Sequence, residues 1–260
     1  MHPSLSRLHQ LRPTDPLVRW LVDPDKDDLS LGGDLVSDGS NVAWRGRATR
    51  PGENWVTGLG EDPVRVAALV VGLAETGQVD GVTVPDKTFP VLPESLRSPD
   101  PGHWCLWTRP ADLPVDPAGV AGAVDLALDD ARIAPLLAHS ASAHLFPGNP
   151  RLVRWAGVCD GDRLVAVAGQ VREKSGAAHL VSVCTDPAYR GRGLAGKVCS
   201  RLMDAAIAEG APMLVLEMYV DNPAGRRTYQ RLGFTEVGRY YSGLLAHALA
   251  AVEAGSGEGT

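Results

Sequence analysis

Hydrophobic residues in the second half of the chain follow two different spacings. Residues 194–209 place apolar side chains every three or four positions, which is the period of a helix, and Gly210 follows as a stop signal. Residues 179–185 and 213–220 are instead short apolar runs with the length of buried strands. This half therefore predicts strands and helices around one sheet.

Turn and cap residues delimit the other elements of this half. Asp160-Gly161-Asp162 predicts a tight hairpin turn, and Asn222 followed by Pro223 predicts a helix start, with Gly233 as its end. The predicted strands are 123–128, 155–159, 163–171, 179–185, 213–220 and 234–244, and the predicted helices are 130–139, 194–209 and 223–232.

The first half has shorter elements between turns. Asp62 and Pro63 predict the start of a helix that ends at Gly77. The predicted strands of this half are 41–47, 79–84 and 103–109. Fourteen of the 20 prolines lie before residue 119, and three of them make 110–118 a natural linker. We therefore expect a smaller proline-rich α+β domain at 1–114, a second α+β domain at 115–253 and a disordered tail at 254–260.

Composition excludes several classes of partner. A formal net charge of −6 over 260 residues offers no basic field for nucleic acid. The longest apolar runs, such as 66–73, are far shorter than the roughly 20 residues that span a bilayer, and the N-terminal residues lack the apolar core of a secretory signal. The four cysteines form no C-x-x-C pair, so we expect no metal cluster and a reduced, cytoplasmic setting.

Residues 189–198, YRGRGLAGKV, fit three phosphate-binding templates at once. The dinucleotide pattern G-x-G-x-x-G is disfavoured because five residues separate the strand from Gly191, and only 64 residues follow Gly196. The Walker pattern fails because Val198 stands where the Mg²⁺-binding hydroxyl should be. The third template, R-x-x-G-x-A, is an acyl-CoA loop that opens a helix.

The acyl-CoA template agrees with the local charge. Glycines let backbone N–H groups approach a diphosphate, and the positive end of the helix dipole favours the anion. Residues 190–201 contain four basic residues and no acidic one, in a chain that is acidic overall.

Two stretches, VCTDPAYRGRGLAGKV (183–198) and LEMYVDNPAGRRTYQRLGF (216–234), resemble the GNAT superfamily of N-acetyltransferases. The spacing of a strand glutamate and a helix tyrosine is similar to that in ribosomal-protein N-terminal acetyltransferases. The resemblance implies a mixed central sheet with flanking helices, splayed between strands 179–185 and 213–220. It also implies that acetyl-CoA, as co-substrate, lies in that cleft. The sequence leaves open whether the first domain is a degenerate copy of the second.

The same resemblance implies roles for individual residues. The backbone of 183–185 would pair with the pantetheine arm, one of its N–H groups would polarise the thioester carbonyl, and the amides of 191–195 would hold the diphosphate. The predicted acetyl-CoA-binding residues are Val183, Cys184, Thr185, Arg190, Gly191, Arg192, Gly193, Leu194, Ala195 and Asn222.

Two further residues are predicted to move protons. Tyr229 lies where the family's tyrosine protonates the leaving thiolate, and Glu217, the only charge on its apolar strand, is the candidate base. His179 and a water relay are competing bases, and a covalent acyl intermediate on Cys184 is the alternative to direct transfer.

The expected function is transfer of acetyl from acetyl-CoA to a primary amine, by direct attack in a ternary complex. The acceptor would be a small molecule or a peptide N-terminus. The alternatives are a non-catalytic acyl-CoA-binding regulator, or an interaction protein whose first half, with five of the six tryptophans, supplies the function. The acceptor, the acyl chain length and the oligomeric state are left open.

Overall fold

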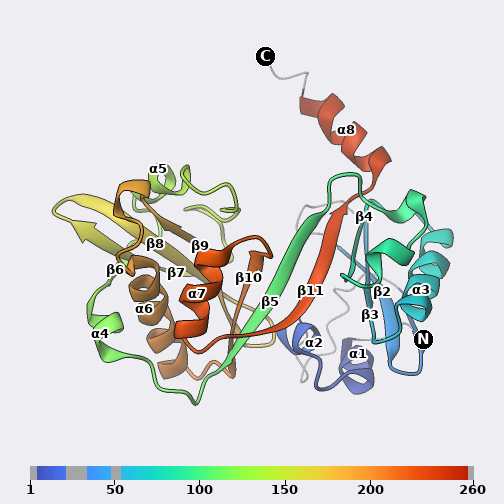
Figure 1. The fold of residues 1–260 in the computed structure, drawn as a ribbon, viewed down its shortest axis with the longest axis horizontal. Helices are drawn as coiled ribbons and strands as arrows, with labels where there is room; N and C mark the ends of the chain where they lie inside the picture. Colours follow the sequence, from blue (N-terminus) through green and yellow to red (C-terminus); the bar gives the residue numbers. More distant parts are fainter. Residues whose placement is uncertain (1–4, 22–33, 48–53, 257–260) are drawn as a thin grey trace. The chain divides into compact units, whose positions relative to one another are not determined.

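The computed structural model describes residues 5–21, 34–47 and 54–256 (Figure 1). These residues form two compact units. One consists of the chain up to Cys105 together with the chain from Gly238 onward, and the other is Leu106–Val237. The division falls within strands β5 (Gly102–Pro110) and β11 (Thr235–Leu244). The predicted domain boundary at 114/115 stays a prediction.

The second unit is a mixed sheet with flanking helices, as expected. Its strands are β6 (Val124–Leu126), β7 (Leu152–Asp160), β8 (Arg163–Arg172), β9 (Ala178–Thr185) and β10 (Met213–Tyr219), in the order β5-β10-β9-β8-β7-β6. Its helices are α4 (Pro117–Ala121), α5 (Ile133–Leu137), η4 (Pro187–Tyr189), α6 (Leu194–Ala208) and α7 (Pro223–Arg231). Strands β6 to β9 are antiparallel, and β10 runs parallel to β9.

The core of this unit explains why β8 shows no alternation of polar and apolar residues. Eight consecutive residues, Leu164–Val171, are buried. Both α5 and α6 contact β8, and α5 packs with Trp155, Val167 and Val171 in one apolar cluster. A strand covered on both faces reads as a continuous hydrophobic run.

The parallel pair β9–β10 opens toward the end of β9. Its paired residues are Leu214 with Ala178 and Val215 with His179, at the start of both strands. Further along β9, Ser182 has φ +50°, a conformation rare for a residue with a side chain. The Ser182 hydroxyl donates to the Leu145 carbonyl at 2.8 Å and accepts from its N–H at 3.3 Å, which holds the distortion in place. The predicted splay between these strands is present.

The first unit has its own sheet and helices. The strands are β1 (Leu35–Asp38), β2 (Asn41–Arg47), β3 (Asn54–Leu59) and β4 (Gly81–Pro85), in the order β1-β2-β3-β4-β11. The helices are α1 (Leu5–Leu11), α2 (Pro16–Leu21), α3 (Pro63–Glu75), η2 (Phe89–Val91), η3 (Glu94–Leu96) and α8 (Ala246–Ser256). As predicted, Asp62 caps α3 by accepting from the N–H groups of Val64 and Arg65.

The two units repeat one order of elements. In the first unit, the antiparallel strands β1, β2 and β3 lead through α3 to β4, which is parallel to β3. In the second unit, β7, β8 and β9 lead through α6 to β10 in the same way. The links differ, because only Gly60, Glu61 and Asp62 join β3 to α3, and they contribute two acids and no arginine. The first unit therefore has the shape of the repeat without the basic glycine-rich loop.

Several predicted elements are corrected. The helix predicted at 130–139 is only Ile133–Leu137, because Pro135 has no N–H to continue a helix that starts much earlier. The predicted linker 110–118 contains the start of α4, which Asp116 caps and Pro117 opens. Part of the predicted tail 254–260 belongs to α8, and 257–260 lie outside the described residues.

Candidate active site

A cleft of about 430 Å³ lies in the second unit at the open end of β9. Its walls are the end of β9, the glycine-rich loop, the first turn of α6 and one side of α7. The lining residues are Val183, Thr185, Tyr189, Arg190, Gly191, Gly193, Leu194, Ala195, Asn222, Ala224, Gly225, Arg227, Thr228, Tyr229 and Arg231. Nine of the twelve predicted site residues are among them, and Cys184, Arg192 and Glu217 are not.

The loop presents an open helix N-terminus to this cleft. Gly191 and Gly193 have φ +78° and +74°, and a Cβ at either position would meet no atom within 4 Å. Gly193 is the N-cap of α6 and has no side chain to cap it, whereas Asn222 caps α7 through Gly225 N–H at 2.8 Å. The first N–H groups of α6 are thus free for an anion, which the helix dipole also favours.

The charge of the cleft matches an anionic ligand. Its lining contains the three arginines Arg190, Arg227 and Arg231 and no acidic residue. Arg190 donates to the carbonyls of Thr185 (3.2 Å) and His139 (3.4 Å), so its guanidinium also holds the loop. Arg192 donates to the Ala188 carbonyl and lies over the Tyr189 ring, 4.8 Å from its centroid, rather than in the cleft wall.

Asp186 fixes the turn between β9 and the loop. Its buried carboxylate accepts from Ala188 N–H at 2.9 Å and from the Arg163 guanidinium at 2.5 Å. The hydrogen bond from the Ala188 backbone, followed by that from Arg163, lowers the pKa of this carboxyl below its usual value. The ionised form therefore contributes stability above the unfolded pKa of about 3.9, and this contribution is lost as pH falls through the lower folded pKa.

We expect Asp186→Asn to lower the melting temperature at pH 7, because the amide keeps the shape of the turn but removes the charge. The difference from the unchanged protein should shrink as pH falls from about 5 to 3. Thermal melts of both proteins across this range test the expectation. Asp162→Asn, at an exposed position of the neighbouring hairpin, is the matched control. A difference that stays constant with pH would contradict it.

Tyr229 is a largely buried residue of the cleft lining. It is 8% exposed, packs edge-on against Phe234 with ring centroids 6.2 Å apart, and has no hydrogen-bond partner in the described part of the chain. Burial, with a smaller contribution from Cys199, raises the pKa of its hydroxyl well above the usual value near 10. The hydroxyl is therefore neutral, and it belongs to a residue that lines the cleft.

Three predicted or alternative residues lie elsewhere. The Cys184 side chain points to the opposite face of β9, where its thiol donates to the Leu136 carbonyl at 3.3 Å and burial raises its pKa. His179 is 4% exposed at the far end of β9 from Thr185, with Nδ1 2.9 Å from the Glu173 carboxylate. Glu217 is partly buried on β10, outside the cleft lining. This placement disfavours the cysteine and histidine alternatives, and the role of Glu217 stays a prediction.

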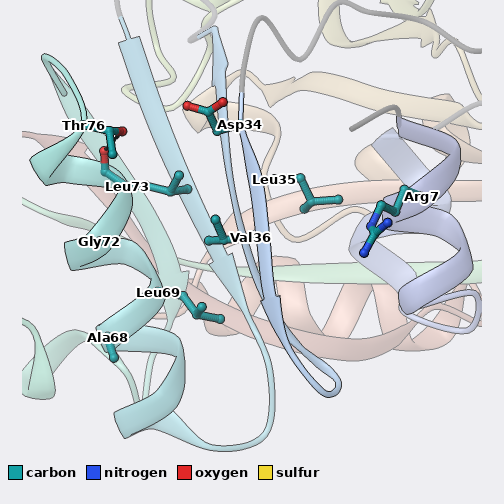
Figure 2. Close-up of a pocket in the computed structure, with 9 residues that line it drawn as sticks. All are labelled: Arg7, Asp34, Leu35, Val36, Ala68, Leu69, Gly72, Leu73 and Thr76. Atoms are coloured by element: carbon teal, nitrogen blue, oxygen red, sulfur yellow. Dashed lines mark hydrogen bonds between the residues drawn. The ribbon is translucent and has the colours of Figure 1, made fainter. Parts of the chain in front are cut away.

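A second cavity, of about 590 Å³, lies in the first unit between β1, α1 and α3. Figure 2 shows Leu69 and Leu73 of α3 directed toward the Val36 side of β1, whereas Leu35 points to the other side of the strand, toward Arg7. It is lined by the middle and end of α3 rather than by its capped N-terminus. This cavity therefore lacks the backbone donors that distinguish the first cleft.

Among the described residues, no cluster of three or more His, Cys, Asp or Glu side chains could hold a metal ion. Nor is any described helix both long and apolar enough to cross a membrane.

Residues 83–234 match the model of the acetyltransferase (GNAT) family, and this span is more than half of the chain. The chain belongs to the GNAT acetyltransferase family. The match ends at Phe234 and so includes the whole cleft, from β9 to α7. The resemblance of the two sequence stretches to this family is confirmed.

Curated relatives match smaller parts of the chain. N-alpha-acetyltransferase 30 of Schizosaccharomyces pombe is 43% identical over 53 residues, 20% of this chain and 35% of that protein. N-acetylaspartate synthetase of Rattus norvegicus is 27% identical over 84 residues, 32% of this chain and 28% of that protein. The chain thus spans about a third of the length of the curated relatives that it matches.

Solved GNAT structures share the fold over most of the chain. An acetyltransferase from Novosphingobium aromaticivorans is 26% identical with a TM-score of 0.51, covering 83% of this chain and 94% of that one. A GCN5-related N-acetyltransferase from Kribbella flavida is 17% identical with a TM-score of 0.52, covering 93% and 95%. The second similarity is one of fold alone.

Several residues of the α7 wall of this GNAT cleft are not among the predicted site residues, although Asn222 and Tyr229 of the same wall are. Ala224, Arg227, Thr228 and Arg231 line it, and they recur every three or four residues along the helix. The helical spacing of these residues can be read from the sequence. The sequence does not show, however, that this face of α7 lies against the cleft.

Proposed function

We propose that this protein transfers an acetyl group from acetyl-CoA to a primary amine, by direct attack within a ternary complex. The observation that carries the proposal is that two kinds of group line one cleft. The uncapped start of α6 follows two left-handed glycines there, and Tyr229, whose hydroxyl is neutral, lines the same cleft. The first would suit a diphosphate and the second a leaving thiolate.

The proposed reaction takes its acid, Tyr229, from the cleft lining, and its base from Glu217, outside that lining, or from a water relay. The neutral amine nitrogen bonds to the thioester carbon, the C–S bond breaks, and the thiolate takes the proton of the Tyr229 hydroxyl. The amine gives up one proton to the base, and this proton returns to the Tyr229 oxygen to restore the enzyme, so the products are the amide and free CoA. A backbone N–H of β9, at Val183, would polarise the carbonyl oxygen.

The acceptor is proposed from the names of the curated relatives. One is an N-alpha-acetyltransferase and the other an N-acetylaspartate synthetase, so their names cover a protein N-terminus and a small amino compound. We propose a primary amine of one of these classes. A screen that measures thiol release from acetyl-CoA against amino acids, polyamines, aminoglycosides and peptides would identify it.

We expect acetyl-CoA to raise the melting temperature, whereas NAD and ATP should not. At 100 times the dissociation constant, binding adds about 2.7 kcal/mol, which corresponds to roughly 5 °C or more for a protein of this size. Calorimetry should give one site per chain, because the repeat in the first unit lacks the basic loop. An equal shift with NAD would contradict the proposal. Binding without thiol release for any amine would favour the non-catalytic alternative.

A further inference from the structure

Two arginines on the α7 wall of the cleft have no counter-ion among the described residues. Arg227 and Arg231 are exposed and line the cleft, and neither makes a hydrogen bond or ion pair in the described part of the chain. Their neighbour Arg226 differs, because it pairs with Glu236 and lies over the Trp107 ring, 5.2 Å from its centroid. Of the three arginines of α7, Arg226 thus pairs within the protein, whereas Arg227 and Arg231 lie along the cleft.

The position of these side chains is not explained by the helix itself. Arginines four residues apart lie one above the other on a helix, and two like charges there destabilise it slightly. Arg231 gains from the helix dipole because it lies in the last turn, but Arg227 lies one turn earlier, beyond the reach of that effect. Two unpaired guanidiniums along a cleft wall that contains no acid form a ready site for a phosphate dianion.

We propose that Arg227 and Arg231 bind the ribose 3′-phosphate of the donor and so select CoA thioesters over acyl donors that lack this group. The inference rests on the proposed function, because the loop amides must hold the diphosphate first. The α6 N-terminus then accounts for the diphosphate, and the α7 arginines account for the remaining dianion. These arginines would select the acyl donor, whichever amine is acetylated.

The test compares acetyl-CoA with 3′-dephospho-acetyl-CoA, which differ only in that phosphate. Dissociation constants of both are measured by calorimetry for the unchanged protein, for R227Q, R231Q and the double variant, and for R97Q. Arg97 is an exposed arginine outside the cleft, so R97Q removes the same charge without touching the site. Glutamine keeps the length and helix preference of the side chain, and melting temperatures without ligand report whether each variant folds.

We expect the unchanged protein and R97Q to bind acetyl-CoA about tenfold or more tightly than the dephospho form, as charge-assisted hydrogen bonds would give. The double variant should lose this preference, with affinity for the dephospho form unchanged. Equal affinities of the unchanged protein for the two ligands would overturn the inference and leave the proposed function intact. So would a double variant that binds both ligands more weakly by the same factor. If the unchanged protein binds neither ligand, both proposals fall.

Discussion

Replacing Tyr229 by phenylalanine is expected to lower kcat by about 100-fold or more, with little change in the KM for acetyl-CoA. The variant removes one oxygen atom and keeps the ring that packs against Phe234. The departing thiolate would then lack its proton donor, which is needed only as the C–S bond breaks. Because burial keeps the hydroxyl neutral, the effect should be present across the neutral and mildly alkaline pH range.

Steady-state kinetics with a fixed amine acceptor measures this effect, and Tyr219→Phe is the matched control. Tyr219 is 50% exposed at the end of β10 and does not line the cleft. A kcat that is unchanged in Tyr229→Phe would remove this residue as the acid. A large rise in KM alone would instead make it a binding residue.

Replacing Gly193 by valine is expected to abolish the thermal stabilisation by acetyl-CoA. The position has φ +74°, which costs a β-branched residue roughly 1–2 kcal/mol or more in backbone strain. A side chain there would stand in the open space above the loop, where the diphosphate must approach the N–H groups of α6. The affinity of Gly193→Val for acetyl-CoA should therefore fall by a larger free energy than its stability to unfolding.

Gly210→Val is the control that separates the effect of backbone strain from the effect of blocking the diphosphate site. Gly210 has φ +80° and equally open surroundings, but it lies at the other end of α6. Both variants should lower the melting temperature without ligand by similar amounts, and only Gly193→Val should lose the response to acetyl-CoA. If Gly193→Val still responds, the diphosphate site lies elsewhere.

The elements that the sequence predicted well carry local signals at their ends. Asp62 and Pro63 define the start of α3, and Asn222 and Pro223 define the start of α7, through contacts between residues no more than three apart. The hairpin between β7 and β8 follows from Gly161, which takes φ +57° in the turn. Such interactions need no other part of the chain.

Elements without such signals were missed or mistaken. β3 was not predicted, because its residues Asn54–Leu59 become a strand by pairing with β2 and β4. α8 was not predicted, although its alanines favour a helix, because its weak amphipathicity gives no apolar pattern of helical period. For β3, long-range pairing outweighs a weak local preference.

The sequence alone determined the form of the glycine-rich loop, because glycine conformation, basic charge and an uncapped helix start are all local properties of residues 190–195. Only the tertiary structure decided which side chains share the cleft with that loop. Alternation along β9 turns Val183 and Thr185 toward the ligand space and Cys184 away from it, and the divergence of β9 from β10 opens that space. The arginines of α7 acquire their position through packing between segments some 35 residues apart, which no local pattern encodes.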